Sequence, residues 1–267
     1  MRLYVINLGR RSDRWAFMSA QLAELGLEAR RIEAVDASRE GEVLRSRFDA
    51  GALARDFPAT LGDVACTLTH QSIWLRIADE GAPAIILEDD ARLSPAFAEI
   101  VRLDLGRMMR EHDMGAIKLE YWPGPQNSRR FVAGRVMADL PWGMRLYRLR
   151  STFLGTAAYA ISPQGAALMC QRFPRLAVPV DHALFGREAN LGFRLLRPGF
   201  INPAPVLHDI AGFSSDIVPQ RRAERLAEMP RPWTRRLRDW VVRSRLAREI
   251  ARGECARIEM RFADQPD

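Results

Sequence analysis

Three consecutive carboxylates, Glu88, Asp89 and Asp90, directly follow an apolar run at residues 84–87. Like charges crowded in this way repel one another, and a divalent cation with a preference for oxygen ligands, such as Mg²⁺ or Mn²⁺, relieves the repulsion. Ligands of open α/β sheets bind at the carboxyl ends of strands, where this cluster falls. The cluster therefore predicts a metal site that bridges to diphosphate oxygens. The alternative is a solvated acidic turn before the helix expected after Pro95.

The elements that position this cluster begin with a strand, a helix and a second strand. Residues 3–8 are a short apolar run of β-formers, and apolar residues recur at helical spacing from Trp15 to Leu25, where Gly26 predicts the helix end. Residues 27–35 are typical of a second strand. This order is typical of an α/β protein whose sheet is at least partly parallel.

Helices and strands continue to alternate through the middle of the chain, and residues 198–207 are too rich in proline for a central strand. The expected helices cover residues 63–81, 94–105 and 165–173, with a short one near 49–55, and the expected strands cover 84–87, 115–121 and 154–162.

Six segments along the chain carry a family resemblance. They are VINLGRRSDRW at 5–15, AVD at 34–36, GDVACTLTHQSIW at 62–74, AIILEDDARL at 84–93, GTAAYAISPQGA at 155–166 and PVDHALF at 179–185. In this order they resemble glycosyltransferase family 25, which includes bacterial lipooligosaccharide galactosyltransferases and the related collagen galactosyltransferases. The resemblance implies a Rossmann-type, mostly parallel nucleotide-sugar-binding domain of the GT-A kind over residues 1–218. It also implies a UDP-sugar donor, with galactose the commonest sugar, held through Mn²⁺ or Mg²⁺ and transferred with inversion.

Carried onto this sequence, the acidic metal motif of the family corresponds to Glu88 and Asp90, with Asp89 between them. GT-A enzymes often add a late histidine to the metal ligands. The resemblance therefore makes His208 a candidate ligand.

A polar turn follows the first strand and contains Asn7, Arg10, Arg11 and Arg14. Guanidinium groups suit a diphosphate, so this turn is expected to contact the donor. The alternative makes Arg10 and Arg11 surface residues. Asp36, after the second strand, either accepts hydrogen bonds from the ribose or base, or caps the local turn.

Further candidates lie on the later motifs. His70 lies in the middle of a helix, where it is either a donor-site residue or a packed one, and Trp74 shares its face and is expected in the core. Gly155, Thr156 and Tyr159 are expected on a strand that faces the pocket. Their backbone either approaches the sugar or packs against its neighbours.

An inverting transfer needs a base to accept the proton of the attacking hydroxyl, and Asp181 is the main candidate. The alternatives are that Asp181 binds sugar hydroxyls or caps a helix. Asp209 and Glu120 are weaker candidates for the base.

The formal net charge of +7 is concentrated near the end of the chain, since residues 219–267 contain 13 arginines and eight acids. Residues 231–252 predict a basic amphipathic helix, which either lies on an anionic membrane surface, near a lipid-linked saccharide acceptor, or packs on the domain. No nucleic-acid-binding motif accompanies the charge, so a saccharide acceptor is expected rather than nucleic acid. Of the 40 basic residues only Lys118 is lysine, a bias that indicates genome composition.

The three cysteines are far apart and form no CxxC pair, and no apolar run is long enough for a signal peptide or a membrane span. Both observations favour a cytoplasmic protein, either free or attached to the membrane surface. Two other functions remain open. One is a metal-dependent nucleotidyltransferase or phosphohydrolase, and the other is a catalytically degenerate carbohydrate-binding protein.

Overall fold

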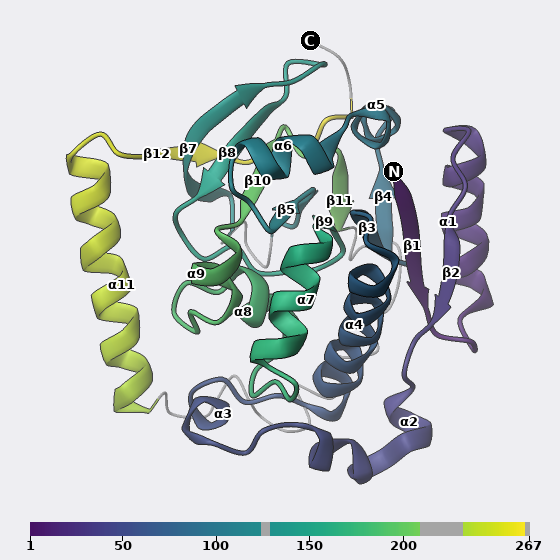
Figure 1. The fold of residues 1–267 in the computed structure, drawn as a ribbon, viewed down its shortest axis with the longest axis horizontal. Coiled ribbons are helices and arrows are strands. Elements are labelled where there is room, and N and C mark those ends of the chain that lie inside the picture. Colours follow the sequence, from purple (N-terminus) through teal and green to yellow (C-terminus); the bar gives the residue numbers. More distant parts are fainter. Residues whose placement is uncertain (124–128, 209–231, 265–267) are drawn as a thin grey trace.

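A nine-stranded sheet forms the centre of an α/β fold in the computed structural model, which describes residues 1–123, 129–208 and 232–264 (Figure 1). The strands lie in the order β12-β7-β8-β10-β5-β9-β3-β1-β2. They are β1 (Arg2–Asn7), β2 (Arg30–Glu33), β3 (Ala84–Glu88), β5 (Ala116–Lys118), β7 (Phe131–Asp139), β8 (Arg145–Leu149), β9 (Ala158–Ile161), β10 (Gly199–Asn202) and β12 (Ala256–Glu259).

Strand direction agrees with the predicted mostly parallel sheet. The pairings make β1, β2, β3, β5, β7 and β10 run one way and β8, β9 and β12 the other, so six of nine strands share a direction. The pairing itself is mixed, because β9 lies between β3 and β5 and is antiparallel to both. Direct parallel neighbours are confined to β2-β1-β3 and β5-β10.

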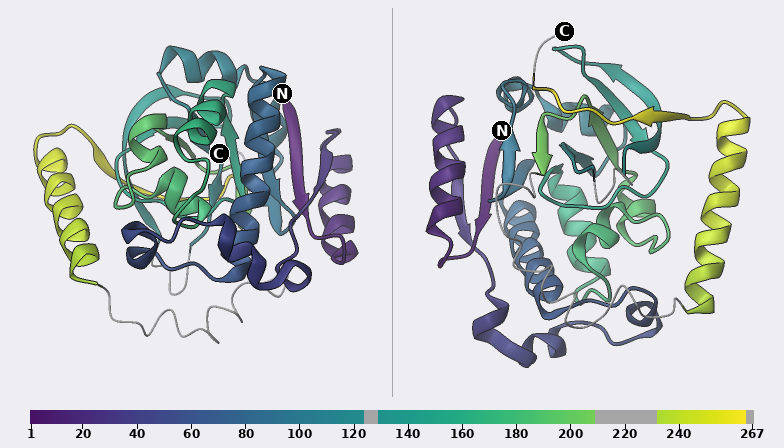
Figure 2. Two further views of the ribbon diagram at one scale, coloured as in Figure 1. Left: turned by 60° about the horizontal axis from the view of Figure 1, so that its bottom comes forward. Right: turned by 180° about the vertical axis from the view of Figure 1, so that it is seen from behind.

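Helices cover both faces of the sheet (Figures 1 and 2). Along β1, Tyr4 and Ile6 face one apolar core while Leu3 and Val5 face the other, as the two-residue period of a strand requires. The first core is covered by α4 (Leu61–Glu80), α7 (Pro163–Arg172), α8 (Val180–Phe185) and α9 (Gly192–Leu196), and the second by α1 (Ser12–Glu24), α5 (Ala96–Arg102) and α6 (Leu105–Glu111). The short elements α2 (Ala37–Glu40), η1 (Gly41–Arg47) and α3 (Ala52–Asp56) connect β2 to α4.

Local sequence explains the ends of α4, the longest of the helices on these faces. Thr60 accepts a hydrogen bond from the Asp63 backbone N–H, and the Asp63 carboxylate accepts one from the Thr60 backbone N–H. This reciprocal cap fixes the start of the helix. Gly81 ends it in the left-handed region, at a φ of 64°, as the sequence predicts.

A second, three-stranded sheet links distant parts of the chain. It has the order β4-β11-β6 and contains β4 (Ala91–Leu93), β11 (Val206–His208) and β6 (Glu120–Tyr121). The antiparallel register places His208 opposite Ala91, directly after the acidic motif. This sheet thus brings residues more than a hundred positions apart to the end of β3.

The proline-rich run at 198–207 corrects one expectation. Its first part forms β10, which lies between β8 and β5 inside the main sheet. Pro198 and Pro203 flank this strand, so the ladder keeps the backbone N–H groups that it needs.

The C-terminal segment contains the predicted helix, α11 (Trp233–Ala251), and then β12, which the prediction lacked. β12 pairs with β7 at the edge of the main sheet. α11 lies at one side of the molecule (Figure 2), and none of its residues is buried. The predicted boundary at residue 218 falls outside the described residues. None of the described helices is both long and apolar enough to cross a bilayer.

Candidate active site

The three carboxylates at the end of β3 take different places. Asp89 is buried, and both of its oxygens are bonded: Oδ2 accepts from the Asn7 amide at 2.6 Å and Oδ1 from the Arg14 guanidinium at 2.9 Å. Arg14 also lies 3.3 Å from Asp90 Oδ2. Burial raises the pKa of Asp89, against the opposing effect of Arg14. Asp89 therefore holds the turn after β1 and α1 against the end of β3.

Asn7 and Arg14 therefore hold the acidic motif in place, and their predicted contacts with a donor stay predictions. The Asn7 amide also donates to the Arg11 carbonyl at 2.9 Å, and its oxygen accepts from Arg31 at 2.5 Å. The register of β1 against β3 places Ile6 opposite Glu88, so the two strands end side by side.

Asp90 and His208 form the second part of the site. The His208 Nε2 atom lies 3.6 Å from Asp90 Oδ2, across the β4-β11 pairing. Burial alone would lower the pKa of His208, but the neighbouring Asp90 carboxylate, with further help from Glu120 and Glu88, raises it to about 9. For the Asp90 carboxyl, burial has the opposite sign and raises the pKa. His208 and Arg14 outweigh burial and bring the pKa of Asp90 below its ordinary value.

Asp90 and His208 each carry one donor atom that no group in the described part of the chain satisfies. Asp90 Oδ1 and His208 Nδ1 are buried and have no hydrogen-bond partner among the described residues. Buried polar atoms are normally satisfied, so such atoms mark a place where a further group is expected. Carboxylate oxygen and imidazole nitrogen are donors that Mn²⁺ accepts.

Glu88 lies at the end of a row of polar side chains that leads into the core. Its Oε1 accepts from the Thr156 hydroxyl at 2.7 Å and lies 3.4 Å from His70 Nε2. The Tyr159 hydroxyl lies 2.8 Å from His70 Nδ1 and accepts from the Trp74 indole at 2.8 Å. Because an indole can only donate, the tyrosine hydroxyl is free to donate to Nδ1, which leaves the Nε2 proton facing Glu88.

This row settles the location of three predicted residues. His70 is fully buried, and its Nε2 atom, which has no hydrogen-bond partner among the described residues, faces Glu88. Trp74 lies in the core as expected, and Tyr159 joins the two. Cys66 also lies near this point, since its sulfur and one ligand atom each of His70 and Glu88 lie within 4.8 Å of one another.

A buried ion pair lies beside the site. Lys118 and Glu120 have fully buried side chains and are bonded to each other. The Lys118 ammonium also donates to the Gly155 carbonyl, and Glu120 Oε2 accepts from the Ala158 backbone N–H at 3.0 Å. Burial lowers the pKa of Lys118, and Glu120 opposes this shift. The pair therefore fixes the backbone at residues 155–158.

Asp181 contacts the same backbone segment at Gly155. Its Oδ2 accepts from the Gly155 N–H at 3.3 Å, and its Oδ1 from the His182 N–H at 2.7 Å. The helix-cap alternative for Asp181 is wrong, because Pro179 is the cap residue of α8. Gly155 has a φ of 105°, and a Cβ there would lie 2.4 Å from Glu120, so only glycine fits this crossing point.

The remaining predicted donor residues lie nearer the surface. Arg10 pairs with Asp36 at 3.1 Å, and Arg11 with Asp13 at 2.9 Å. Asp36 caps α2 by accepting from the Ser38 N–H at 2.9 Å, which is the turn-capping alternative. Contacts of these residues with a donor stay predictions. Asp209 lies outside the described residues.

Lys118 is the residue whose importance the sequence prediction missed. Its signal was present, because it is the only lysine among 40 basic residues and lies in an apolar strand. Its partner Glu120 had been considered only as a weaker base. Glu120 is fully buried and bonded to the lysine, so it is a structural group rather than a proton acceptor.

Comparison with known proteins gives one family. A family model described as glycosyltransferase family 25 (LPS biosynthesis protein) matches residues 1–184. A glycosyltransferase 25 family member of Drosophila melanogaster is 28% identical over 211 residues, which cover 71% of this chain and 31% of the relative. The human procollagen galactosyltransferase 2 is 32% identical over 102 residues, 36% of this chain and 16% of the relative.

The similarities also have limits. This chain spans about a third or less of the length of these relatives. A mouse protein named inactive glycosyltransferase 25 family member 3 is 30% identical over 116 residues, 41% of this chain and 19% of the relative. A solved glycosyltransferase involved in glycosylation of the PBCV-1 major capsid has a TM-score of 0.37 and 9% identity, with 85% of this chain and 100% of that one covered.

Proposed function

Because this chain belongs to glycosyltransferase family 25, we propose that it transfers galactose from UDP-galactose to a saccharide acceptor with inversion, using Mn²⁺ or Mg²⁺. The observation that supports this most directly is the pair of buried, unpartnered atoms on Asp90 and His208 at the carboxyl end of β3. The human relative's name supports galactose.

In this proposal Asp90 and His208, with Glu88 at the same strand end, hold the cation. The bound cation would neutralise charge on the departing UDP. Arg14 keeps Asp90 in place, while Asp89 is committed to Arg14 and Asn7. We therefore propose three of the four predicted ligands as metal ligands and assign Asp89 a supporting role through Arg14 and Asn7.

Asp181 is proposed as the base. Its carboxylate takes the proton of the acceptor hydroxyl as that oxygen forms a bond to the anomeric carbon and the bond to UDP breaks. The Gly155 N–H positions one of its oxygens, and the charge of the buried Lys118 acts on it as well. We propose that Thr156, whose hydroxyl donates to Glu88 at 2.7 Å, contacts the donor sugar.

We further propose a glycan-biosynthetic role in the cytoplasm, with a saccharide or lipid-linked saccharide as the acceptor. The exposed tryptophans of α11, Trp233 at 73% and Trp240 at 65%, support peripheral contact with an anionic membrane surface. The main competing function is a degenerate carbohydrate-binding protein, which the inactive mouse relative supports. A metal-dependent nucleotidyltransferase or phosphohydrolase would need the same carboxylates without a sugar acceptor.

Calorimetry with UDP-galactose tests the proposal. We expect binding in Mn²⁺ that is lost in EDTA, and a loss of about a hundredfold in affinity for Asp90→Asn, as for loss of a metal contact. Asp139→Asn, an exposed carboxylate on β7, is the matched control and should bind as the parent protein does. Metal-independent binding that Asp90→Asn leaves unchanged would remove the acidic motif from the mechanism. Binding without transfer to any saccharide would favour the degenerate protein.

A further inference from the structure

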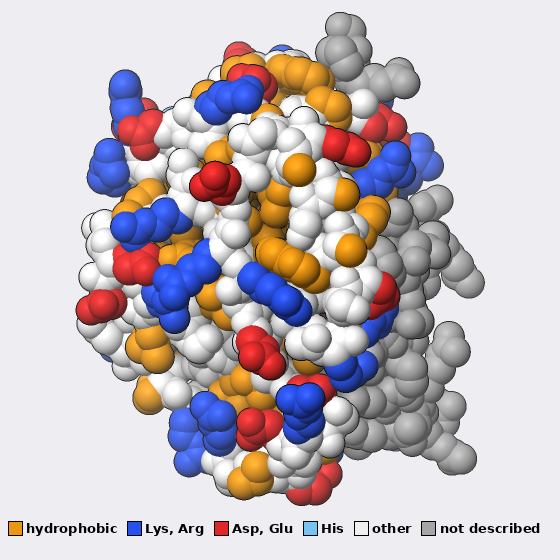
Figure 3. Space-filling view, turned by 90° about the vertical axis from the view of Figure 1, so that its right-hand side faces the viewer, with side chains coloured by type: hydrophobic (Ala, Val, Ile, Leu, Met, Phe, Trp, Pro, Cys, Tyr) orange, Lys and Arg blue, Asp and Glu red, His pale blue; other side chains and the backbone are white. Residues whose placement is uncertain are grey.

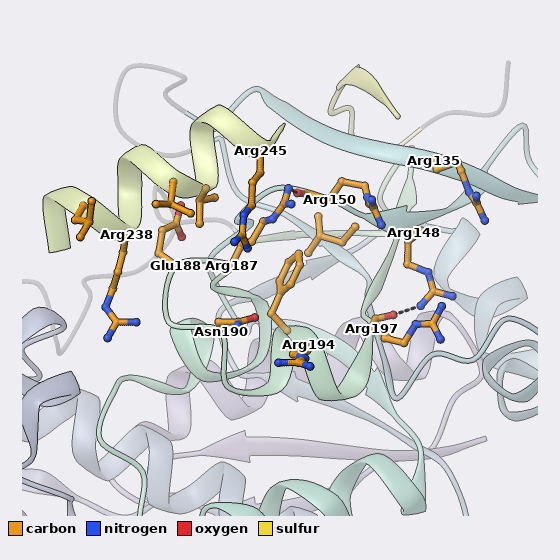
Figure 4. Close-up of a pocket in the computed structure, with 15 residues that line it drawn as sticks. Arg135, Arg148, Arg150, Arg187, Glu188, Asn190, Arg194, Arg197, Arg238 and Arg245 are labelled. Carbon is orange, nitrogen blue, oxygen red and sulfur yellow. Dashed lines mark hydrogen bonds between the residues drawn. The ribbon is translucent and has the colours of Figure 1, made fainter. Parts of the chain in front are cut away.

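A second charged region lies beneath α11, away from the residues described so far. A cavity of about 710 Å³ opens there between the helix, the ends of β7 and β8, and the segment around α9 (Figure 4). Its volume is in the range of small-molecule sites. None of the proposed metal, donor or base residues lines it.

Arginine dominates the lining of this cavity. Eight of its lining residues are arginines, and Glu188 is its single acid: the arginines are Arg135, Arg148, Arg150, Arg187, Arg194, Arg197, Arg238 and Arg245. By contrast, the face over α1 and β2 mixes basic and acidic side chains (Figure 3). The high arginine content of the chain alone does not predict such a one-signed wall.

Five of these arginines have structural partners. Arg150 and Arg187 pair with Glu249, Arg197 with Asp113, and Arg238 with Asp56 at 3.0 Å. Arg148 donates to three backbone carbonyls, those of His112, Asp113 and Arg197. Burial lowers the pKa of Arg148 to about 10, and the neighbouring Arg197 acts in the same direction.

Three arginines differ from the rest. Arg135, Arg194 and Arg245 come from β7, α9 and α11, and none has a carboxylate partner among the described residues. Figure 4 shows Arg245 and Arg194 on opposite sides of the cavity. These three guanidinium groups line the cavity without a counter-charge in the described part of the chain, and a phosphate offers the geometry that a guanidinium group matches.

The cavity also has an apolar side. Leu237, Val241 and Val242 of α11 and Phe193 of α9 line it between the arginines. An aromatic ring and aliphatic side chains suit the C–H face of a sugar, while the guanidinium groups suit its phosphates. α11 is held over the cavity at both ends, by Arg238 to Asp56 and by Arg187 to Glu249. The cavity therefore has both cationic and apolar walls, and ion pairs hold α11 over it.

We infer that this cavity binds a phosphorylated saccharide, with Arg135, Arg194 and Arg245 contacting its phosphate groups. The same chemistry occurs in a free sugar phosphate and in the head group of a phosphorylated glycolipid. The inference stands whether or not the chain transfers galactose, because it uses none of the residues at the end of β3.

The test is calorimetry with glucose 1,6-bisphosphate in EDTA at low salt, with glucose as the uncharged comparison. We expect saturable binding of the bisphosphate and none of glucose. Arg194→Gln with Arg245→Gln should weaken binding about tenfold or more, since two charge-assisted contacts are lost. Arg135→Gln, on a different element, should weaken it in the same direction.

The matched control is Arg236→Gln with Arg243→Gln, which removes the same charge from exposed positions of α11 outside the cavity lining. It should keep the affinity within about twofold. An equal loss in the control would show diffuse attraction and overturn the inference, as would absent binding or displacement by UDP. An unchanged midpoint of urea denaturation shows that the variants are folded.

Vesicles distinguish the source of the phosphate. Phosphatidylcholine vesicles containing phosphatidic acid either compete with the bisphosphate, which identifies a lipid head group, or fail to compete, which identifies a soluble sugar phosphate. In both cases binding must depend on Arg194 and Arg245, and vesicle binding that ignores them would contradict the inferred site.

Discussion

At the carboxyl end of β3 the charged side chains are buried or half-buried and pair with one another through part of their atoms. The arginines beneath α11 are instead largely exposed, and three lack a carboxylate partner among the described residues. The first arrangement holds groups in fixed positions before any ligand arrives, which suits chemistry that depends on orientation. The second leaves charge uncompensated at the surface, where salt screens it. The comparison suggests that one region is built for reaction and the other for capture of an anion.

Asp181→Asn gives the largest expected effect. An amide cannot take the acceptor proton, so we expect kcat to fall about 10²- to 10⁴-fold while UDP-galactose affinity stays unchanged. Initial rates of UDP release with a saccharide acceptor measure this. A loss of donor binding with kcat retained would instead assign Asp181 to the sugar hydroxyls.

Lys118→Met tests how much the buried Lys118–Glu120 ion pair contributes to the free energy of unfolding. Removing the ammonium leaves Glu120 buried without its partner, which costs about 3–5 kcal/mol in free energy of unfolding. Urea denaturation measures the loss. The double variant Lys118→Met with Glu120→Gln removes both charges and should recover most of it. A single variant as stable as the parent protein would show that the pair does not hold residues 155–158.

Glu249→Gln applies the corresponding test to the region beneath α11 and should have the smallest effect. Arg150 keeps contact with solvent, but Arg187 and Glu249 are mostly buried, so we expect a loss of about 1–2 kcal/mol in the same urea measurement, less than for the fully buried Lys118. Affinity for glucose 1,6-bisphosphate should rise slightly, because Arg150 and Arg187, which line the cavity, lose a competing carboxylate. A loss as large as that of Lys118→Met would mean that α11 is part of the folded core.

The sequence by itself determined the positions of several helices and strands and which segments carry charged, potentially functional side chains. The apolar periods place β1, α1, α4, β3 and α11 within a few residues of their observed bounds, because such periods depend only on neighbouring residues. Gly26 and Gly81 end their helices at positive φ as expected. The position of the acidic motif at the end of β3 could likewise be read from the chain.

Only the tertiary structure decided which partner each of these charged residues contacts. Asp89 is committed to Asn7 and Arg14 because β1 and β3 end side by side, and His208 reaches Asp90 because β11 pairs with β4. Strand order and register join segments far apart in the chain, and no local period encodes them. The same reason explains why β10 could take a central place and why Lys118, read as a matter of composition, became the partner of Glu120.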